Sequence, residues 1–240
     1  MKAFLLAAGY GTRLRPITDT VPKCLVPICG KPLLDWWFEL FQKHGITEVL
    51  INTHYLAEPV RSYLREYNEA HENFMCHEVF EPELLGSGGT IRNNRAFVQG
   101  EESFLICYAD NLTNADLTAF QKVHSLNDGV LTMALFHTNL PEQCGIAEID
   151  DERRIVSFIE KPKYPKGNLA NAGMYIARQE LFDYLPDGDE PLDFGKGVLP
   201  KLTGRMYGWQ TQGYLLDIGT MENYKKAQTD WANLSQSRIK

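Results

Sequence analysis

The chain has 240 residues, of which 44% are hydrophobic and 23% are charged, and its formal net charge is −7. This composition excludes a disordered chain and argues against a nucleic-acid-binding protein, because such proteins usually carry a basic face. The five cysteines include no CxxC pair, so we expect free thiols in a cytoplasmic protein. No apolar run approaches the ~20 residues of a membrane span, and the run 3–8 is too short for a signal peptide.

Strand-like and helix-like segments alternate through the first half of the chain. Apolar residues recur three or four positions apart in segment 33–43, which predicts an amphipathic helix ended by His44 and Gly45. The same reasoning predicts strand 2–8, helix 33–43, strand 49–52, helix 57–67, strand 74–80, helix 89–97 and strand 104–108. This alternation implies an α/β, Rossmann-like central sheet with parallel strands and helices on both faces.

The second half of the chain is richer in strands. Short apolar runs separated by turn residues predict strands 130–136, 147–149, 155–159, 172–177 and 214–216, followed by a helix over 222–234. The whole sheet should therefore be mixed. No repeat or linker interrupts the chain, so we expect one domain over residues 1–240.

A glycine-rich loop follows the first predicted strand, in the segment LAAGYGTRLRPIT at residues 6–18. Glycines directly after a strand let the backbone approach a ligand and turn its N–H groups toward phosphate. Arg13, Arg15 and Lys23 add positive charge close by. The loop is neither a Walker A loop nor a GxGxxG dinucleotide turn. It therefore predicts a polyphosphate site, with a solvated basic loop as the alternative.

This segment resembles the LAAGxGTRLRPLT motif of the sugar-1-phosphate nucleotidyltransferase family, the NDP-sugar pyrophosphorylases. Further elements of that family occur in order along the chain: Pro-Lys at 22–23, LGSGGT at 85–90, Tyr-Ala-Asp at 108–110, EKP at 160–162, NAG at 171–173 and DIGT at 217–220. The overall look is most similar to small mannose- and heptose-1-phosphate guanylyltransferases. The resemblance implies a single nucleotidyltransferase domain without the family's C-terminal β-helix.

By resemblance, five residues carry the chemistry. Asp110 and Asp217 would hold one Mg²⁺, since this ion prefers carboxylate and phosphate oxygens. Arg13 would bind the leaving pyrophosphate and Lys23 the α-phosphate region. Lys161 would hold the sugar phosphate. Each residue has a simpler reading as a turn, a cap or a solvated charge, and Arg15 is equally suited to a phosphate contact or a structural ion pair.

The resemblance also implies the residues around the two substrates, an NTP and a sugar 1-phosphate. The nucleotide would contact Leu6, Ala7, Gly9, Gly11, Thr12, Glu81, Gly86 and Gly88. The sugar would contact Gly145, Glu160, Asn171 and Gly173. Glu81 lies where related thymidylyltransferases have a base-reading glutamine. A carboxylate accepts two hydrogen bonds from guanine but is repelled by the uracil and thymine carbonyls, so Glu81 favours GTP, unless it is a solvated loop residue.

Several alternatives stay open at the level of sequence. Ala109 replaces the family's usual glycine and Asn111 follows the aspartate, as in phosphocholine cytidylyltransferases of the same fold. Gly197 stands where an acidic residue is common. UTP- or dTTP-dependent transfer, and a regulatory module that only binds nucleotide sugars, are further alternatives. Trp36, Trp37 and Trp209 suit sugar stacking or, for the first two, a core or interface. The sugar, the pathway and assembly into a homo-oligomer are not determined.

Overall fold

The computed structural model describes residues 1–237, so the last residues of the domain predicted over 1–240 lie outside the described part. The helices are α1 (Leu33–Lys43), α2 (Ala57–Ala70), α3 (Gly86–Asn93), α4 (Leu117–Ser125), α5 (Phe194–Gly197) and α6 (Met221–Ser237). The strands are β1 (Lys2–Leu6), β2 (Pro27–Ile28), β3 (Lys31–Pro32), β4 (Glu48–Thr53), β5 (Met75–Phe80), β6 (Ser103–Tyr108), β7 (Asn111–Thr113), β8 (Leu131–His137), β9 (Gly145–Ile149), β10 (Ile155–Glu160), β11 (Leu169–Arg178), β12 (Met206–Gln210) and β13 (Leu215–Asp217).

The chain divides into two compact units. The β11 unit consists of Met1–Phe4, Leu84–Cys107 and Asp116–Gln212. The glycine-loop unit consists of Leu5–Glu83, Tyr108–Ala115 and the described residues from Gly213 onward. Each unit is therefore assembled from segments that are far apart in the sequence.

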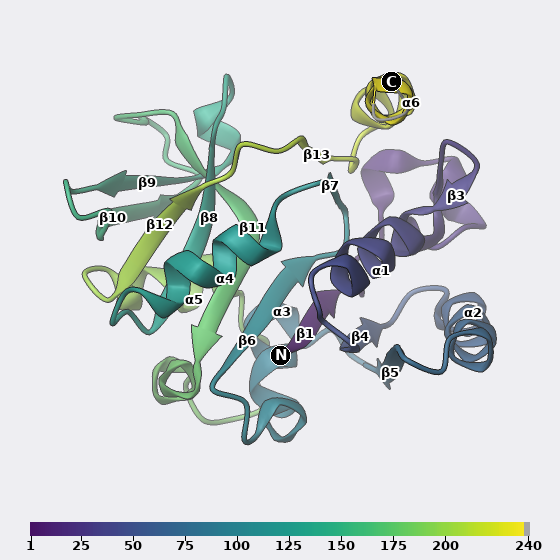
Figure 1. The fold of residues 1–240 in the computed structure, drawn as a ribbon, viewed down its shortest axis with the longest axis horizontal. Coiled ribbons are helices and arrows are strands. Elements are labelled where there is room, and N and C mark those ends of the chain that lie inside the picture. Colours follow the sequence, from purple (N-terminus) through teal and green to yellow (C-terminus); the bar gives the residue numbers. More distant parts are fainter. Residues whose placement is uncertain (238–240) are drawn as a thin grey trace. The chain divides into compact units, whose positions relative to one another are not determined.

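The β11 unit is built on a mixed sheet. Its long strand β11 pairs antiparallel with β6 and β8, while β8 pairs in parallel with β12. The hairpin of β9 and β10 is antiparallel. Helix α4 contacts β8, β11 and β12 (Figure 1). The fully buried rings of Phe104, Phe120, Tyr175 and Phe194 fill the core, so apolar burial holds these strands in place.

The glycine-loop unit combines a parallel strand pair with two short antiparallel pairs. Strands β4 and β5 run in parallel from the pair Glu48 and Met75 to the pair Thr53 and Phe80. Strand β7 pairs with β13, and β2 with β3. Helix α1 contacts β7, α2 contacts β5, and α6 contacts β2 and β13 (Figure 1). The apolar face of α1, including Trp37, Phe38 and Phe41, is buried as its spacing predicts.

The structure confirms the α/β fold with a mixed sheet and corrects several predicted elements. Helix 33–43 has the predicted bounds, and the predicted strands overlap β1, β4–β6, β8–β11 and β13. The helix predicted over 89–97 instead begins at Gly86 and ends at Asn93. Sequence patterns missed β7, β12 and α4, although Asp116 caps α4 by accepting a hydrogen bond from the Ala119 N–H. Among residues 1–237, no helix has the length and apolar character needed to span a membrane.

Candidate active site

The glycine loop (residues 9–23) is folded back on itself. Gly11 has a φ of +64°, and a Cβ at this position would lie 2.9 Å from the Thr18 side chain. The Thr18 hydroxyl donates a hydrogen bond to the Gly11 carbonyl at 2.8 Å, and Leu14 is fully buried. Gly11 is therefore required by the turn itself. Gly9 differs, because within the described chain no heavy atom lies within 4 Å of a Cβ placed there.

Four of the predicted catalytic residues meet in a cation–carboxylate cluster (Arg13, Lys23, Asp110 and Asp217). The Lys23 ammonium lies 2.6 Å from Asp110 Oδ2 and 3.7 Å from Asp217 Oδ1. The Arg13 guanidinium lies 4.0 Å from Asp217 Oδ2. The Lys23 side chain is only 11% exposed, whereas those of Asp110 and Asp217 are 35% and 47% exposed. The two carboxylates are therefore paired with cationic side chains of the protein and remain accessible to solvent.

Pairing of two short strands brings the aspartates together. Asp110 lies in the turn between β6 and β7, beyond the strand end at which the sequence placed it. Asp217 is the last residue of β13 rather than the residue after it. In the β7–β13 ladder Asp217 lies opposite Asn111, and the Ile218 N–H donates to the Asp110 carbonyl at 2.9 Å. The ladder is therefore what juxtaposes these two carboxylates.

Gly219 is a member of this site that sequence reasoning missed. Its N–H donates to Asp217 Oδ1 at 2.6 Å. A Cβ on Gly219 would lie 2.7 Å from Asp217 Oδ1, 3.0 Å from Lys23 Nζ and 3.1 Å from Arg13 Nη2. Glycine at this position therefore gives the cluster its space. The only sequence signal is its place in the Asp-Ile-Gly-Thr segment.

The carboxylates have the chemistry that a hard divalent cation needs. Burial and the negative charge of Asp110 raise the pKa of the Asp217 carboxyl, while Lys23 opposes this rise. A cation bound between them would relieve the same repulsion. Within the described residues no group of three or more His, Cys, Asp and Glu side chains gathers as a ligand set. Two aspartates nevertheless fit Mg²⁺, which usually keeps water and phosphate oxygens as its other ligands.

Glu81 is buried rather than solvated, which corrects one of the two expectations for it. It is 2% exposed, and its carboxylate accepts a hydrogen bond from the Asn52 amide at 2.8 Å. The Asn52 side-chain oxygen accepts from the Ala7 N–H at 2.7 Å. Asn52 therefore links a predicted nucleotide contact, Ala7, to the predicted base reader. Its sequence signal is a polar residue within an apolar strand.

The remaining residues of the predicted nucleotide group fall in different environments. Leu6 is buried at the end of β1, whereas Gly9 and Thr12 are exposed on the glycine loop. Arg15 forms an exposed ion pair with Asp19 at 3.1 Å, which favours its structural role. In the β11 unit, Gly86 and Gly88 pack against Leu192: a Cβ would meet its carbonyl oxygen at 2.6 Å from Gly86 and its Cγ at 2.8 Å from Gly88.

The Leu192 carbonyl also accepts hydrogen bonds from two N–H groups in the first turn of α3. Its oxygen accepts from the Gly88 N–H at 2.7 Å and from the Gly89 N–H at 3.2 Å. A Cβ on Gly197 would lie 2.6 Å from the Leu192 Cδ1. Gly197, which stands where an acidic residue is common in the family, therefore leaves room for the Leu192 side chain. Internal packing is a sufficient reason for these glycines.

In the β11 unit, two of the predicted sugar contacts, Gly145 and Glu160, lie side by side. A Cβ on Gly145 would lie 2.5 Å from Glu160 Oε2, and one on Gly195 would lie 3.2 Å from it. Burial raises the pKa of the Glu160 carboxyl, and the positive charge of Lys161 opposes this rise. Lys161 itself has a φ of +48°, a conformation that is unfavourable for lysine and common at functional sites. Gly195 was not predicted from the sequence.

Asn171 and Gly173 form an irregular point in β11. The Asn171 amide donates to the Tyr175 hydroxyl at 2.6 Å, and its oxygen accepts from the Gly173 N–H at 2.9 Å. Gly173 has a φ of +68°, and the register with β8 shifts between Asn171 and Tyr175. The Asn-Ala-Gly element therefore builds a β-bulge, a feature common beside active sites.

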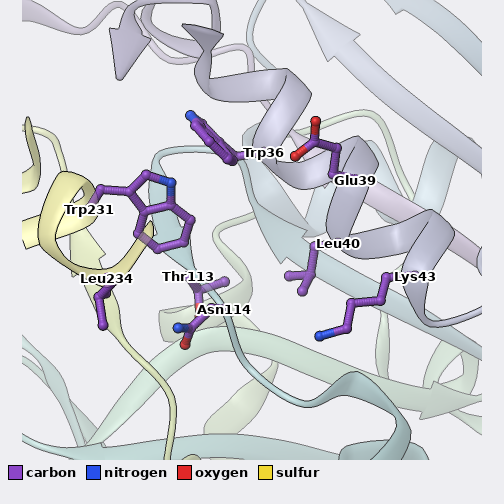
Figure 2. A pocket seen from close by; sticks show the side chains of 8 residues that line it. All are labelled: Trp36, Glu39, Leu40, Lys43, Thr113, Asn114, Trp231 and Leu234. Carbon is purple, nitrogen blue, oxygen red and sulfur yellow. The ribbon is translucent and has the colours of Figure 1, made fainter. Parts of the chain in front are cut away.

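The tryptophans considered for sugar stacking are either buried in the core or line a pocket. Trp37 is buried, and Trp209 is buried with its ring stacked on Phe120 at 4.7 Å between centroids. Trp36 lines a separate pocket of about 140 Å³ in the glycine-loop unit, where its ring meets Trp231 edge to face (Figure 2). The other residues around this pocket are Glu39, Leu40, Lys43, Thr113, Asn114 and Leu234. None of the predicted catalytic or substrate residues lines it.

Known proteins match the chain over nearly its whole length. The family model described as nucleotidyl transferase matches residues 2–233. A UTP–glucose-1-phosphate uridylyltransferase of Synechocystis is 32% identical, over 95% of this chain and 62% of the relative. A D-glycero-α-D-manno-heptose 1-phosphate guanylyltransferase of Aneurinibacillus thermoaerophilus is 32% identical, over 96% of this chain and 98% of the relative. The crystal structure of HddC from Yersinia pseudotuberculosis, also solved with GMP-PN, matches with a TM-score of 0.79 and 28% identity, over 96% of this chain and 99% of that one.

The chain therefore belongs to the nucleotidyl transferase family. Within it, the relatives are sugar-1-phosphate nucleotidylyltransferases, which confirms the family that the sequence motifs indicate. The chain spans less than two thirds of the Synechocystis enzyme but nearly all of the Aneurinibacillus enzyme. These relatives use different nucleotides at similar identity, so membership by itself leaves the nucleotide open.

Proposed function

We propose that this protein transfers a nucleoside monophosphate from an NTP to a sugar 1-phosphate and releases pyrophosphate. The observation that carries the proposal is the cation–carboxylate cluster beside the glycine loop, with Lys23 between two aspartates at 2.6 and 3.7 Å. An oxygen of the sugar phosphate attacks the α-phosphorus, a new P–O bond forms, and the bond to the β-phosphate oxygen breaks. No covalent enzyme intermediate is required.

The residues of the cluster suit a reaction between two polyanions. Arg13 offers forked N–H donors that can bind the pyrophosphate as it leaves. Lys23 neutralises charge near the α-phosphate. Outside the cluster, in the β11 unit, we assign Lys161 to the incoming sugar phosphate. Asp110 and Asp217 would hold Mg²⁺, which when bound polarises the phosphate oxygens and offsets their charge. Catalysis then rests on positioning and electrostatic stabilisation.

For the nucleotide we propose GTP, with a mannose- or heptose-type sugar 1-phosphate as the acceptor. The support comes from the guanylyltransferase that matches over 98% of its length and from the HddC complex with GMP-PN. Glu81 is our candidate for reading guanine, because a carboxylate can accept from both N1–H and the N2 amine. The uridylyltransferase of similar identity makes UTP the main rival.

Pyrophosphate release from purified protein tests the proposal. We would measure kcat/KM for GTP, UTP, dTTP and CTP, each with mannose 1-phosphate, a heptose 1-phosphate and glucose 1-phosphate. CTP with phosphocholine would test the alternative choline chemistry. A higher kcat/KM for another NTP with every accepted sugar would contradict the guanine proposal. If GTP is preferred but Glu81→Gln keeps that preference, another group reads the base.

A further inference from the structure

Two side chains at the end of β4 connect Glu81 to Ala7, just before the glycine loop, and to Tyr10 within it. Asn52 is the next-to-last residue of β4 and His54 follows the strand. Strand β4 pairs in parallel with β5, and Glu81 comes directly after β5. Because they are two positions apart along an extended segment, Asn52 and His54 point to the same side. Both can therefore reach the loop after β1 and the residue after β5.

The first bridge runs through the Asn52 amide. Its Oδ1 lies 2.7 Å from the Ala7 nitrogen, and its Nδ2 lies 2.8 Å from Glu81 Oε1. A backbone N–H can only donate and an ionised carboxylate can only accept, so just one orientation of the amide satisfies both partners. Asn52 is 4% exposed, which protects this bridge from competition with water.

The second bridge runs through the His54 ring. Its Nδ1 lies 2.7 Å from the Glu81 carbonyl oxygen, and its Nε2 lies 3.0 Å from the Tyr10 hydroxyl. The carbonyl only accepts, so Nδ1 carries the proton, and in the neutral ring Nε2 accepts from Tyr10. The Tyr10 ring also meets His54 and Tyr55 at 5.3 and 5.9 Å between centroids. Tyr10, which lies between Gly9 and Gly11, is thus fixed although it is exposed.

We propose that Asn52 and His54 are positioning residues that hold the glycine loop ready for the triphosphate, a role that rests on the proposed function. Glu81 anchors both bridges, one through its side chain and one through its main chain. The Glu81 N–H in turn donates to the Thr53 carbonyl at 2.8 Å, which fixes the anchor to β4. Preorganisation of a loop improves affinity because less freedom is lost on binding.

Tyr10→Phe is the most selective test, since it removes one exposed hydroxyl. We expect the KM and the calorimetric Kd for the NTP to rise about fivefold, the typical effect of losing one neutral hydrogen bond. The KM for the sugar phosphate and the unfolding temperature should not change. Tyr224→Phe is the matched control, because its hydroxyl donates to a main-chain carbonyl elsewhere in the same unit, that of Pro27.

A double-mutant cycle tests the two bridges separately. Tyr10→Phe and His54→Leu break the same bond, so the double variant should have the NTP affinity of His54→Leu alone. Asn52→Leu should weaken NTP binding further when it is added to Tyr10→Phe. If Tyr10→Phe matches the Tyr224→Phe control, or if its effect adds fully to that of His54→Leu, the His54 bridge has no positioning role.

Amide hydrogen exchange of residues 7–11 tests the inference without any turnover. Both Tyr10→Phe and Asn52→Leu should speed exchange in this segment by about fivefold or more relative to the Tyr224→Phe control. Unchanged exchange would overturn the inference. A wild-type protein that releases no pyrophosphate with any NTP would instead remove the proposed function, while the exchange experiment would still decide whether the bridges order the loop.

Discussion

The predicted site residues are arranged by different means in the two units. In the glycine-loop unit, charged side chains from distant segments gather, with Lys23 between Asp110 and Asp217. In the β11 unit, the predicted residues are shaped by the backbone, with positive φ at Lys161 and Gly173. The first arrangement depends on charge and the second on conformation. Substitutions that change only the charge of a side chain should therefore have their largest effects in the glycine-loop unit. Substitutions that change the backbone conformation should matter most in the β11 unit.

The largest effect should come from removing one carboxylate of the cluster. Asp110→Asn keeps the shape of the side chain but removes its charge, so we expect kcat to fall at least ~10²-fold, as on loss of one electrostatic stabiliser. The unfolding temperature should change little. Asp128→Asn is the control, because Asp128 also holds a hydrogen bond, from Tyr207 at 2.8 Å, but lies in the other unit. Near-wild-type turnover of folded Asp110→Asn would end the metal assignment.

Lys161 tests whether charge matters in the β11 unit as well. Lys161→Gly removes the ammonium and tolerates the φ of +48°, so we expect the KM for the sugar phosphate to rise about ten- to hundredfold with a smaller effect on NTP binding. Lys161→Ala keeps the Cβ and the backbone strain of the wild type, so Lys161→Gly should be the more stable of the two variants. Lys163→Ala is the control, because Lys163 is also exposed and lies two positions further along the chain. Lost NTP binding with unchanged sugar-phosphate affinity would reverse the assignment.

A substitution at Gly9 tests whether this glycine is needed for the approach of a ligand rather than for packing inside the protein. A Cβ at Gly9 meets no atom of the described chain within 4 Å, so Gly9→Ala should leave the unfolding temperature unchanged. If the nucleotide approaches this backbone, the added methyl group should raise the KM for the NTP about tenfold, the scale of an overpacked contact. Gly11→Ala, at a positive φ, should instead lower stability. Unchanged nucleotide affinity in Gly9→Ala would place the ligand elsewhere.

Gly145 tests the opposite case, a glycine required by its own unit. A Cβ there would lie 2.5 Å from Glu160 Oε2 and 2.6 Å from Phe158 Cζ. Gly145→Ala should therefore lower the free energy of unfolding by about 1–3 kcal/mol. Gly167→Ala is the control, because a Cβ there meets no atom of the described chain within 4 Å. Denaturant unfolding of both variants gives the comparison, and equal stability would show that Glu160 moves aside freely.

The smallest effect concerns the charge of Glu160. Burial raises the pKa of its carboxyl in the folded protein, so ionisation destabilises the fold as pH rises above the unfolded-state value of about 4.3. Glu160→Gln should therefore raise the unfolding temperature slightly at pH 7, and this gain should vanish near pH 4. The KM for the sugar phosphate should rise. A variant that is less stable than wild type at pH 7 would contradict the effect of burial.

Local patterns predicted much of the fold because apolar periodicity reports which side chains are buried. The spacing in 33–43 gave the bounds of α1, and the apolar runs located β4, β6 and β8. The predicted start of this helix at residue 89 was wrong, because glycines have low helix propensity. In the structure α3 begins at Gly86, and the Leu192 carbonyl accepts hydrogen bonds from the N–H groups of Gly88 and Gly89. A carbonyl from a distant segment leaves no trace in the local sequence.

The sequence by itself determined the family, the order of its motifs and the residues that we propose for the chemistry, because phosphate and metal binding demand particular side chains. Only the tertiary structure decided which of these residues meet. The β7–β13 ladder brings Asp110 to Asp217, and Gly219 leaves space between them and Lys23. Glu81, which follows β5, is buried and accepts a hydrogen bond from the Asn52 amide. The physical reason is that such contacts join segments distant in the chain, and their geometry is set by strand pairing and packing that a single sequence pattern does not record.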